Sequence, residues 1–384
     1  MYKREISVPK NNSYFLFGPR GTGKSTLIKQ LYPDRESLYV DLLLFQTENQ
    51  YARDPDLLYR QVKALSDEKK VVIIDEIQKI PKLLDVVHKL IEETDKRFIL
   101  TGSSARKLKQ GGVNLLAGRA FERTLHPLTS AELGKDFDLL QALQWGTLPG
   151  LGRQVNASDR MDFLQSYANT YLKEEIVSEQ LIRKLDPFRK FLEVAAQHNG
   201  IIINFSNIAE DVGVDSKTVK SYFSILEDTL VGFVLEPYLQ STRKRVHQSP
   251  KFYFFDIGVC RALANLLTVV PAMSTAYYGT LFEHFVILEF IRREAYARKG
   301  FRFYYLSDER QEVDLIIERP GKALALIEIK SAIHIGERQV KKLRNFKSSF
   351  PSAEFYCLSQ DPTTQSFDGI MAYHWQDGLN HLTQ

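Results

Sequence analysis

The sequence predicts an α/β fold built on a parallel sheet, and three stretches near its start carry this prediction. Residues 15–26 read as a short apolar strand, a glycine-rich loop and the start of an amphipathic helix. Residues 71–76 and 97–104 are two further apolar strands; the first ends in Asp75 and Glu76, and the second ends in small hydroxyl residues. Apolar runs of this kind are typical of buried parallel strands. We therefore expect a ligand site where these strands end.

The loop of the first stretch fits the pattern G-x-x-x-x-G-K-[ST] from Gly18 to Ser25. Backbone N–H groups of such a loop surround phosphates, and the following helix adds the partial positive charge of its N-terminus. Lys24 would contact the β- and γ-phosphates, and Ser25 would reach Mg²⁺. The alternative is a glycine-rich turn that matches by chance, which the flanking strand and helix disfavour. The predicted ATP-binding residues of the loop are Gly18, Pro19, Arg20, Gly21, Thr22, Gly23, Lys24, Ser25 and Thr26.

The strands at 71–76 and 97–104 supply further groups to this site. Asp75 would hold the Mg²⁺ shell, and Glu76 would orient or deprotonate the attacking water. The alternative is an acidic turn after a core strand, but the position of the two carboxylates along the sequence, after a complete phosphate loop, favours the nucleotide role. Thr101 and Ser103 could sense the γ-phosphate, or they could simply cap a loop.

Arg119 follows a glycine in the segment 116–120. It is a candidate arginine finger for the transition state of nucleotide hydrolysis, a role worth roughly 10³ to 10⁵ in rate. The alternative is a solvated or ion-paired arginine.

The segments GPRGTGKST, VVIIDEIQKIP, ILTGSS and LAGRA before HPLTSAEL resemble the AAA-type ATPase module found in a broad group of prokaryotic proteins. The resemblance extends over essentially the whole chain. It implies ATP hydrolysis, and it implies that a C-terminal domain with a restriction-endonuclease-like fold follows the ATPase module. If Arg119 completes the site of a neighbouring copy, the protein would be a homo-oligomer.

Residues 186–256 predict a winged helix. Three helices are expected, with Gly213 in the turn before the last one and Asp215 at its cap, followed by two strands around a basic tip. The third helix has an apolar face and a polar face that could meet DNA in a major groove. The alternative is a winged helix that serves only as a packing module. The predicted DNA-binding residues are Lys217, Lys220, Arg243, Lys244 and Arg245.

A second group of acidic residues is predicted near the C-terminus. Residues 279–290 form a strongly apolar helix that carries Glu283, and strands follow it. Strand alternation places Glu328 and Lys330 on one face, within reach of Asp314 on the neighbouring strand. Such carboxylates suit Mg²⁺, with Asp314 and Glu328 as ligands, and the lysine can position a water or help to deprotonate it.

This arrangement of Asp314, Glu328 and Lys330 resembles the PD-(D/E)XK nuclease family, with Glu283 in the place of that family's helix carboxylate. Val313 rather than proline precedes the aspartate, which the family tolerates. The resemblance implies Mg²⁺-dependent hydrolysis of a DNA phosphodiester. The alternative is a nuclease-like fold kept as a scaffold, in which these residues form a structural ion-pair cluster.

Composition sets the limits of the prediction. A length of 384 residues suggests two or three domains, and a net charge of +4 permits DNA binding without requiring it. Cys260 and Cys357 lie far apart and no C-x-x-C occurs, so neither a disulfide framework nor a thiolate zinc site is indicated. No run approaches the roughly 18 apolar residues of a membrane span. We therefore expect a soluble cytoplasmic protein without a membrane partner.

Four domains follow from these observations: an AAA-type P-loop ATPase core (1–130), a helical lid or connector (131–185), a winged helix (186–256) and a PD-(D/E)XK nuclease-like domain (257–384). The predicted function is hydrolysis of ATP coupled to action on DNA, with a Mg²⁺-dependent nuclease-like C-terminal domain. The alternative is a nucleotide-gated switch or scaffold that binds DNA or protein without cutting. The predicted catalytic residues are Glu76, Arg119, Glu283, Asp314, Glu328 and Lys330.

Overall fold

The computed structural model describes residues 2–104, 108, 116, 118–171, 185–238, 248–308 and 311–384. The chain divides into two units. The first unit comprises Met1–Leu128, Leu148–Gly150 and Ile225–Val231, and the second comprises Thr129–Thr147, Leu151–Ser224 and Gly232–Gln384. Most of the segment 131–185, which we predicted as a connector, belongs to the second unit.

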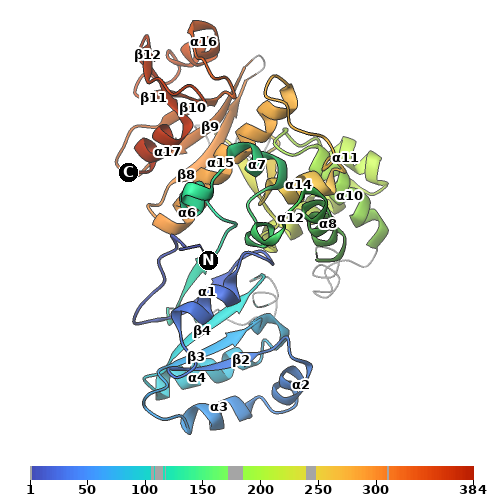
Figure 1. The fold of residues 1–384 in the computed structure, drawn as a ribbon, viewed down its shortest axis with the longest axis vertical. Coiled ribbons are helices and arrows are strands. Elements are labelled where there is room, and N and C mark those ends of the chain that lie inside the picture. Colours follow the sequence, from blue (N-terminus) through green and yellow to red (C-terminus); the bar gives the residue numbers. More distant parts are fainter. Residues whose placement is uncertain are drawn as a thin grey trace. The chain divides into compact units, whose positions relative to one another are not determined.

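A parallel five-stranded sheet organises the first unit, with the strand order β2-β3-β4-β1-β5 (Figure 1). The strands are β1 (Ser13–Phe17), β2 (Ser37–Asp41), β3 (Val71–Asp75), β4 (Arg97–Gly102) and β5 (Ala120–Thr124). The central strands β1 and β3 are buried along their whole length, as the apolar runs predicted. Because all five strands run in the same direction, their carboxyl ends meet at one edge of the sheet.

The helices of the first unit are α1 (Lys24–Leu31), α2 (Phe45–Arg53), α3 (Asp56–Lys63) and α4 (Leu83–Glu93), with a short 3-10 turn at Ile77–Lys79. Helix α3 buries Leu58 and Val62 and lies beside α4 (Figure 1). Helix α2 had no counterpart in the sequence prediction. Its single buried side chain is Tyr51, so its apolar pattern is weak.

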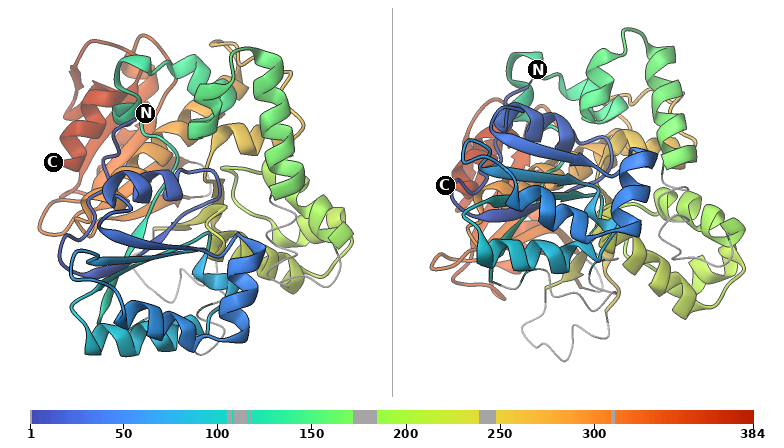
Figure 2. Two further views of the ribbon diagram at one scale, coloured as in Figure 1. Left: turned by 60° about the horizontal axis from the view of Figure 1, so that its bottom comes forward. Right: turned by 90° about the horizontal axis from the view of Figure 1, so that it is seen from below.

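A group of three helices followed by a hairpin belongs to the second unit, except that the end of the third helix, from Ile225 onward, is assigned to the first unit. These elements are α10 (Leu185–Gln197), α11 (Phe205–Val212), α12 (Ser216–Asp228), and the antiparallel strands β6 (Gly232–Pro237) and β7 (Lys251–Phe254). Figure 2 shows α10 and α11 side by side in light green. Gly213 ends α11 with a left-handed backbone (φ 77°), a conformation that favours glycine. The Asp215 carboxylate then accepts the backbone N–H groups of Lys217 and Thr218, both at 2.9 Å, and so caps α12.

An eight-stranded sheet, with the order β12-β13-β11-β10-β9-β8-β6-β7, forms the rest of the second unit's framework. Its further strands are β8 (Arg302–Ser307), β9 (Glu312–Glu318), β10 (Ala325–Ile329), β11 (Glu354–Ser359), β12 (Gln365–Phe367) and β13 (Ile370–His374). Strands β8, β9 and β10 are antiparallel neighbours, whereas β10, β11 and β13 run parallel.

Helices cover both faces of this sheet. Helix α15 (Ala276–Ala297) and helix α17 (Trp375–Thr383) share one apolar core with alternate residues of β9 and β10, including Leu315 and Ile327. Helix α16 (Glu337–Phe346) packs on the other face against Ile316 and Leu326. The two cores explain why β9 and β10 read as nearly continuous apolar runs.

The remaining helices of the second unit are α6 (Ser130–Leu133), α7 (Leu139–Trp145), α8 (Ala157–Ser166) and α14 (Ile257–Leu263), with a 3-10 turn at Gly134–Asp136 and a π-helical turn at Tyr167–Tyr171. A further 3-10 turn, Pro149–Arg153, begins in the first unit and ends in the second. In the part of the chain that the structure describes, no helix combines the length and the apolar character that a membrane crossing requires.

Candidate functional site

Two glycines give the phosphate loop its path between β1 and α1. A Cβ atom at Gly18 would lie 2.3 Å from the carbonyl oxygen of Leu125, because the backbone of Leu125 bonds directly to Phe17 (N–O 2.8 Å). Gly23 adopts φ 93° immediately before α1 begins. A side chain at either position would be strained, so the loop can follow this path only with glycine at both.

The lysine of the loop is buried beneath it. Lys24 Nζ donates to the carbonyl oxygens of Gly18 (2.7 Å) and Pro19 (3.3 Å), and the Thr22 hydroxyl donates to Pro19 O (2.9 Å). Arg4 supports the loop from outside the motif, since its guanidinium donates to Thr22 O at 2.8 Å. No pattern in the sequence connects Arg4 with this loop, and we did not predict its role. Of the other predicted loop residues, Pro19 is buried, whereas Arg20, Gly21 and Thr26 are exposed.

Three hydroxyl groups converge on the buried carboxylate of Asp75 at the end of β3. Ser25 Oγ donates to Asp75 Oδ2 at 2.8 Å, Tyr39 OH donates to the same oxygen, and Thr101 Oγ1 donates to Oδ1. Burial and the hydrogen bond to Asp75 raise the pKa of Tyr39, so this phenol stays protonated as a donor. The predicted residues Ser25, Asp75 and Thr101 are therefore brought together. Tyr39, on the neighbouring strand β2, was missed because a single tyrosine in a strand carries no signal.

Glu76 follows Asp75 with a left-handed backbone, φ 61°, which a residue with a side chain adopts only at a cost of about 1–3 kcal/mol. The side chain of Gln78 joins its carboxylate to the next strand: Gln78 Nε2 donates both to Glu76 Oε2 and to Ser103 Oγ, the latter at 3.1 Å. Glu76 and Ser103 are thus linked, as the prediction of a common site requires. The linking residue Gln78 lies in the segment VVIIDEIQKIP but was not singled out.

Arg119 lies in an ion pair on the surface of the first unit. Its guanidinium is 2.5 Å from the Glu92 carboxylate on α4, and its side chain is 41% exposed. This contact matches the ion-paired alternative that the sequence left open. Because this ion pair lies within one chain, the role of Arg119 as an arginine finger toward another copy stays a prediction.

The acidic residues of the second unit meet where the ladder between β9 and β10 ends. The last backbone pair is Leu315 with Ile327, and beyond it the Asp314 side chain takes over: its Oδ2 accepts the backbone N–H of Ile329 at 2.7 Å. Asp314 is therefore fixed beside Glu328, the residue that lies between Ile327 and Ile329 on β10.

Glu328 is fully buried and only partly satisfied. Its Oε1 accepts from Lys330 Nζ and lies 3.8 Å from Lys342 Nζ on α16, but its Oε2 has no hydrogen-bond partner among the described residues. Burial and the charge of Asp314 raise the pKa of Glu328 to about 7. Burial opposes the charge of Lys330, but Asp314 and Glu328 outweigh it and raise the pKa of this lysine.

Glu283, on α15, belongs to the same group of charges. Its Oε1 accepts from the Tyr253 hydroxyl at 2.9 Å and lies 3.7 Å from Lys251 Nζ. Burial and the nearby charge of Asp314 raise the pKa of Glu283 to about 7. Lys251 and Tyr253 come from β7, far from the Glu-x-Lys motif, so sequence spacing could not reveal them.

The donor sets of both sites suit Mg²⁺. In the first unit a hydroxyl and a carboxylate, Ser25 and Asp75, lie within hydrogen-bond distance of each other. In the second unit the buried Glu328 Oε2 has no hydrogen-bond partner within the described part of the chain, as a metal-binding oxygen would without its ion. The described residues contain no group of three His, Cys, Asp or Glu side chains arranged to hold a metal, so further ligands would have to be backbone oxygens or water.

The predicted DNA-contacting residues are only partly described. Lys217 and Lys220 are exposed on α12, and Lys220 Nζ lies 5.0 Å from the ring centre of Phe205. Arg243, Lys244 and Arg245 lie outside the described residues.

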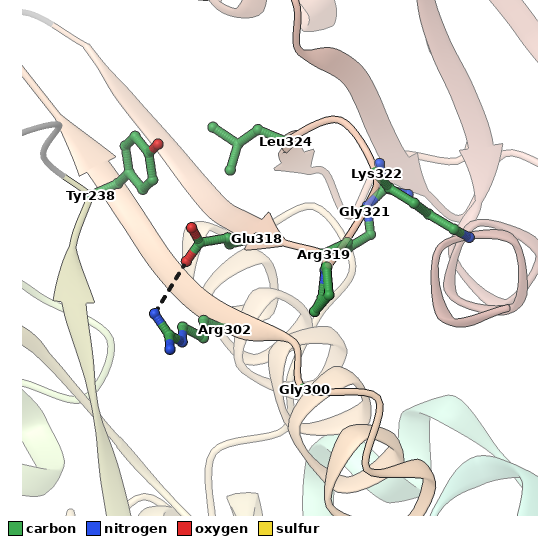
Figure 3. A pocket seen from close by; sticks show the side chains of 9 residues that line it. Tyr238, Gly300, Arg302, Glu318, Arg319, Gly321, Lys322 and Leu324 are labelled. Carbon is green, nitrogen blue, oxygen red and sulfur yellow. Dashed lines mark ion pairs between the residues drawn. The ribbon is translucent and has the colours of Figure 1, made fainter.

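A separate depression of about 450 Å³ lies over β8, β9 and the turn that follows β9 (Figure 3). An ion pair between Arg302 and Glu318, 3.9 Å apart, crosses it. None of the residues predicted from the sequence lines this depression.

Comparison with protein families divides the chain into three parts. An AAA domain matches residues 10–134. Two domains of unknown function, DUF8612 and DUF4143, match residues 136–269 and 278–376. The AAA match includes every residue that we placed in the nucleotide site from the sequence.

Similar chains occur in bacteria and archaea. An uncharacterised protein of Mycobacterium tuberculosis is 26% identical over 309 residues, which cover 80% of this chain and 68% of the relative. An uncharacterised protein of Methanocaldococcus jannaschii is 24% identical over 396 residues, covering 90% and 80%.

Among solved structures, the Aeropyrum pernix ORC1 protein in complex with DNA aligns at 15% identity with a TM-score of 0.29, covering 68% of this chain and 87% of that one. Domain III of the Thermotoga maritima replication initiation protein DnaA aligns at 15% identity with a TM-score of 0.23, covering 57% and 85%. From the parallel sheet, the phosphate loop and the AAA match, the chain combines an AAA-type P-loop NTPase domain with a C-terminal α/β domain.

Proposed function

We propose that the first unit binds and hydrolyses ATP. The observation that carries this proposal is the convergence of Ser25, Tyr39 and Thr101 on Asp75 beside the phosphate loop. Lys24 would leave the carbonyl oxygens of Gly18 and Pro19 to contact the β- and γ-phosphates. Mg²⁺ held through Ser25 and Asp75 would supply positive charge to the phosphates.

Glu76 acts as the general base in this proposal. The water oxygen bonds to the γ-phosphorus, the bond to the β,γ-bridging oxygen breaks, and the water proton passes to the Glu76 carboxylate. Gln78 holds this carboxylate beside Ser103, which supports a role for Ser103 in sensing the γ-phosphate. Thr101 would share this role, because its hydroxyl donates to Asp75 and accepts the backbone N–H of Glu76. Arg119 would complete the site of a neighbouring copy in an oligomer after leaving Glu92.

Phosphate release from Mg²⁺·ATP tests the proposal, with Lys24→Ala as the variant. We expect turnover to fall by roughly 10² to 10³, since the lysine stabilises charge that develops in the transition state. Lys70→Ala is the matched control, because Lys70 is exposed and directly precedes β3, at the opposite end from Asp75. No turnover in the wild type, or equal turnover in Lys24→Ala, would overturn the ATPase proposal.

A second activity is favoured by the Glu328 oxygen that has no hydrogen-bond partner among the described residues: Mg²⁺-dependent cleavage of DNA by the second unit. Asp314 and Glu328 would hold the ion, which would polarise the phosphodiester and lower the pKa of a bound water. Lys330 would position the attacking water, and Glu283 would complete the acidic group. This assignment corresponds to a PD-(D/E)XK domain.

DNA would be bound by the three-helix and hairpin region, which we propose to be a winged helix. The exposed Lys217 and Lys220 on α12 support this role. Replacing both by alanine should weaken DNA binding similarly across sequences and reduce its salt dependence, because phosphate contacts release counterions. Unchanged affinity and salt dependence would contradict this assignment.

The cleavage assay uses linear, branched and single-stranded DNA with Mg²⁺ or Mn²⁺, with and without ATP. We expect cleavage by the wild type and none by Asp314→Ala. DNA that is bound but not cut under every condition would favour the alternative, a nucleotide-gated switch or scaffold. Cleavage that persists in Asp314→Ala would exclude this site as its source.

A further inference from the structure

Lys251 places a buried positive charge among the carboxylates of Glu283, Glu312, Asp314 and Glu328, which we call the acidic group of the second unit. It stands at the start of β7 and its side chain is only 3% exposed. Its Nζ lies 2.5 Å from Glu312 Oε1 and 3.7 Å from Glu283 Oε1. It also lies 5.3 Å from the ring centre of Tyr305, so the cation has an aromatic neighbour on a further side.

The acidic group thus has two ends with different partners. At one end, Glu283 and Glu312 share the ammonium of Lys251, and the Tyr253 hydroxyl donates to Glu283 as well. At the other end, Glu328 Oε2 is fully buried, and no described residue forms a hydrogen bond with it. A carboxylate oxygen is therefore available to an added cation at the Glu328 end. The Glu283 end already contains a cation, the ammonium of Lys251.

We propose that Lys251 occupies the cation position between Glu283 and Glu312, so that the acidic group takes one divalent ion, at Asp314 and Glu328, and not two. The proposal rests on the metal site given above for the second unit. A divalent ion binds carboxylate oxygens at about 2.0–2.6 Å, and an ammonium in contact with Glu312 leaves no room for one there. Lys251 is thus a positioning residue that holds Glu283 and Glu312 through its own charge.

The bound ions can be counted by electron paramagnetic resonance of Mn²⁺ with the full chain and no nucleotide. We expect Lys251→Met to bind one Mn²⁺ more per chain than the wild type, because loss of the ammonium frees the carboxylates of Glu283 and Glu312. Lys341→Met, which removes an exposed charge on α16, should leave the count unchanged. Any ion bound at the nucleotide domain is present in the wild type and in both variants, so it cancels in the difference between their ion counts. No increase in Lys251→Met would overturn the proposal.

A second variant tests the same proposal without removing the buried cation. If Glu283 is ion-paired with Lys251 and is not a metal ligand, Glu283→Gln should change Mn²⁺ affinity by less than about threefold, whereas loss of a metal ligand should exceed the roughly 10- to 100-fold typical of outer-shell changes. A loss of that size in Glu283→Gln would overturn the role of Lys251. This readout remains available if Lys251→Met does not fold.

The two proposals fail in different ways. Glu328→Gln should lower the wild-type count by one, and an unchanged count would refute the metal site itself. If that count falls as expected but Lys251→Met gains no ion, only the role of Lys251 is wrong.

Discussion

The nucleotide site and the acidic site of the second unit both place a carboxylate at the end of a buried strand, but they neutralise it differently. Asp75 receives three hydroxyl groups from Ser25, Tyr39 and Thr101. Glu328 instead faces Lys330 and Lys342, and its second oxygen has no hydrogen-bond partner among the residues that the structure describes. Hydroxyl donors keep a carboxylate charged without cancelling its charge, whereas lysines cancel part of it.

This difference suggests different relations to metal ions. Under the proposed function, the ion that arrives with ATP would meet a carboxylate that has hydroxyl donors. In the acidic site of the second unit, lysines already contact the carboxylates, and we propose that a single ion is added there.

The largest effect should come from Glu76→Gln. Loss of a general base typically costs 10²- to 10⁴-fold, so kcat for ATP should fall by about that factor while ATP affinity stays nearly constant. Rapid-quench turnover and equilibrium nucleotide binding measure the two quantities. Full turnover in Glu76→Gln would remove Glu76 from the mechanism.

Acid pH should destabilise the second unit through His284. Burial lowers the pKa of this histidine to about 4, and its ring contacts Phe254 O and the Asn199 side chain. Because the folded pKa lies below the unfolded value of about 6.5, stability is unaffected above pH 6.5 and falls as pH decreases toward 4, by about 3 kcal/mol.

Urea unfolding followed by tryptophan fluorescence checks this expectation. The chain has two tryptophans, and both Trp145 and Trp375 are buried in the second unit. His284→Gln keeps an amide donor and acceptor but cannot gain the proton. The wild type should therefore lose about 3 kcal/mol relative to this variant between pH 7 and pH 4, and parallel profiles would contradict the assignment.

Glu328→Gln should lower Mn²⁺ affinity at the second unit by at least about 100-fold, since it removes a proposed ligand. Turnover of ATP should be unchanged, because the substitution lies outside the nucleotide site. Titration calorimetry without nucleotide measures the affinity. Glu337→Gln, an exposed glutamate on α16, is the control and should bind Mn²⁺ normally.

Gln78→Leu should have the smallest effect, about a tenfold loss in kcat. It removes the hydrogen bonds that join Glu76 to Ser103, and bonds to charged groups are worth about 1.5–3 kcal/mol. Nucleotide affinity should change less than kcat. A loss as large as that of Glu76→Gln would mean that Gln78 itself contacts the reacting groups.

Contiguous patterns were predictable from the sequence. The glycine loop, the strand ending in Asp75 and Glu76, the strand before Thr101, the α12 cap at Asp215 and the strands carrying Asp314 and Glu328 all lie where local pattern placed them. Helix α2 was missed because a helix with one buried side chain has almost no apolar periodicity.

Tertiary structure decided the partners of these motifs. Tyr39, Gln78 and Arg4 join the nucleotide site, and Lys251 and Tyr253 join the acidic site, through contacts between elements far apart in the chain. Such partners carry no local signature, because a hydrogen bond or ion pair depends on where a side chain ends in space and not on its neighbours in sequence.

Local sequence patterns were sufficient to recognise the phosphate loop, the carboxylate pair that follows a strand and the Glu-x-Lys strand, since each follows from backbone conformation and strand alternation over a few residues. The fold was needed to reveal that hydroxyls satisfy Asp75, that one buried oxygen of Glu328 has no hydrogen-bond partner among the described residues, and that a lysine from β7 lies between Glu283 and Glu312. These features depend on charge balance inside the fold, and that balance is set by distances between elements, which the packing of the sheets and helices fixes.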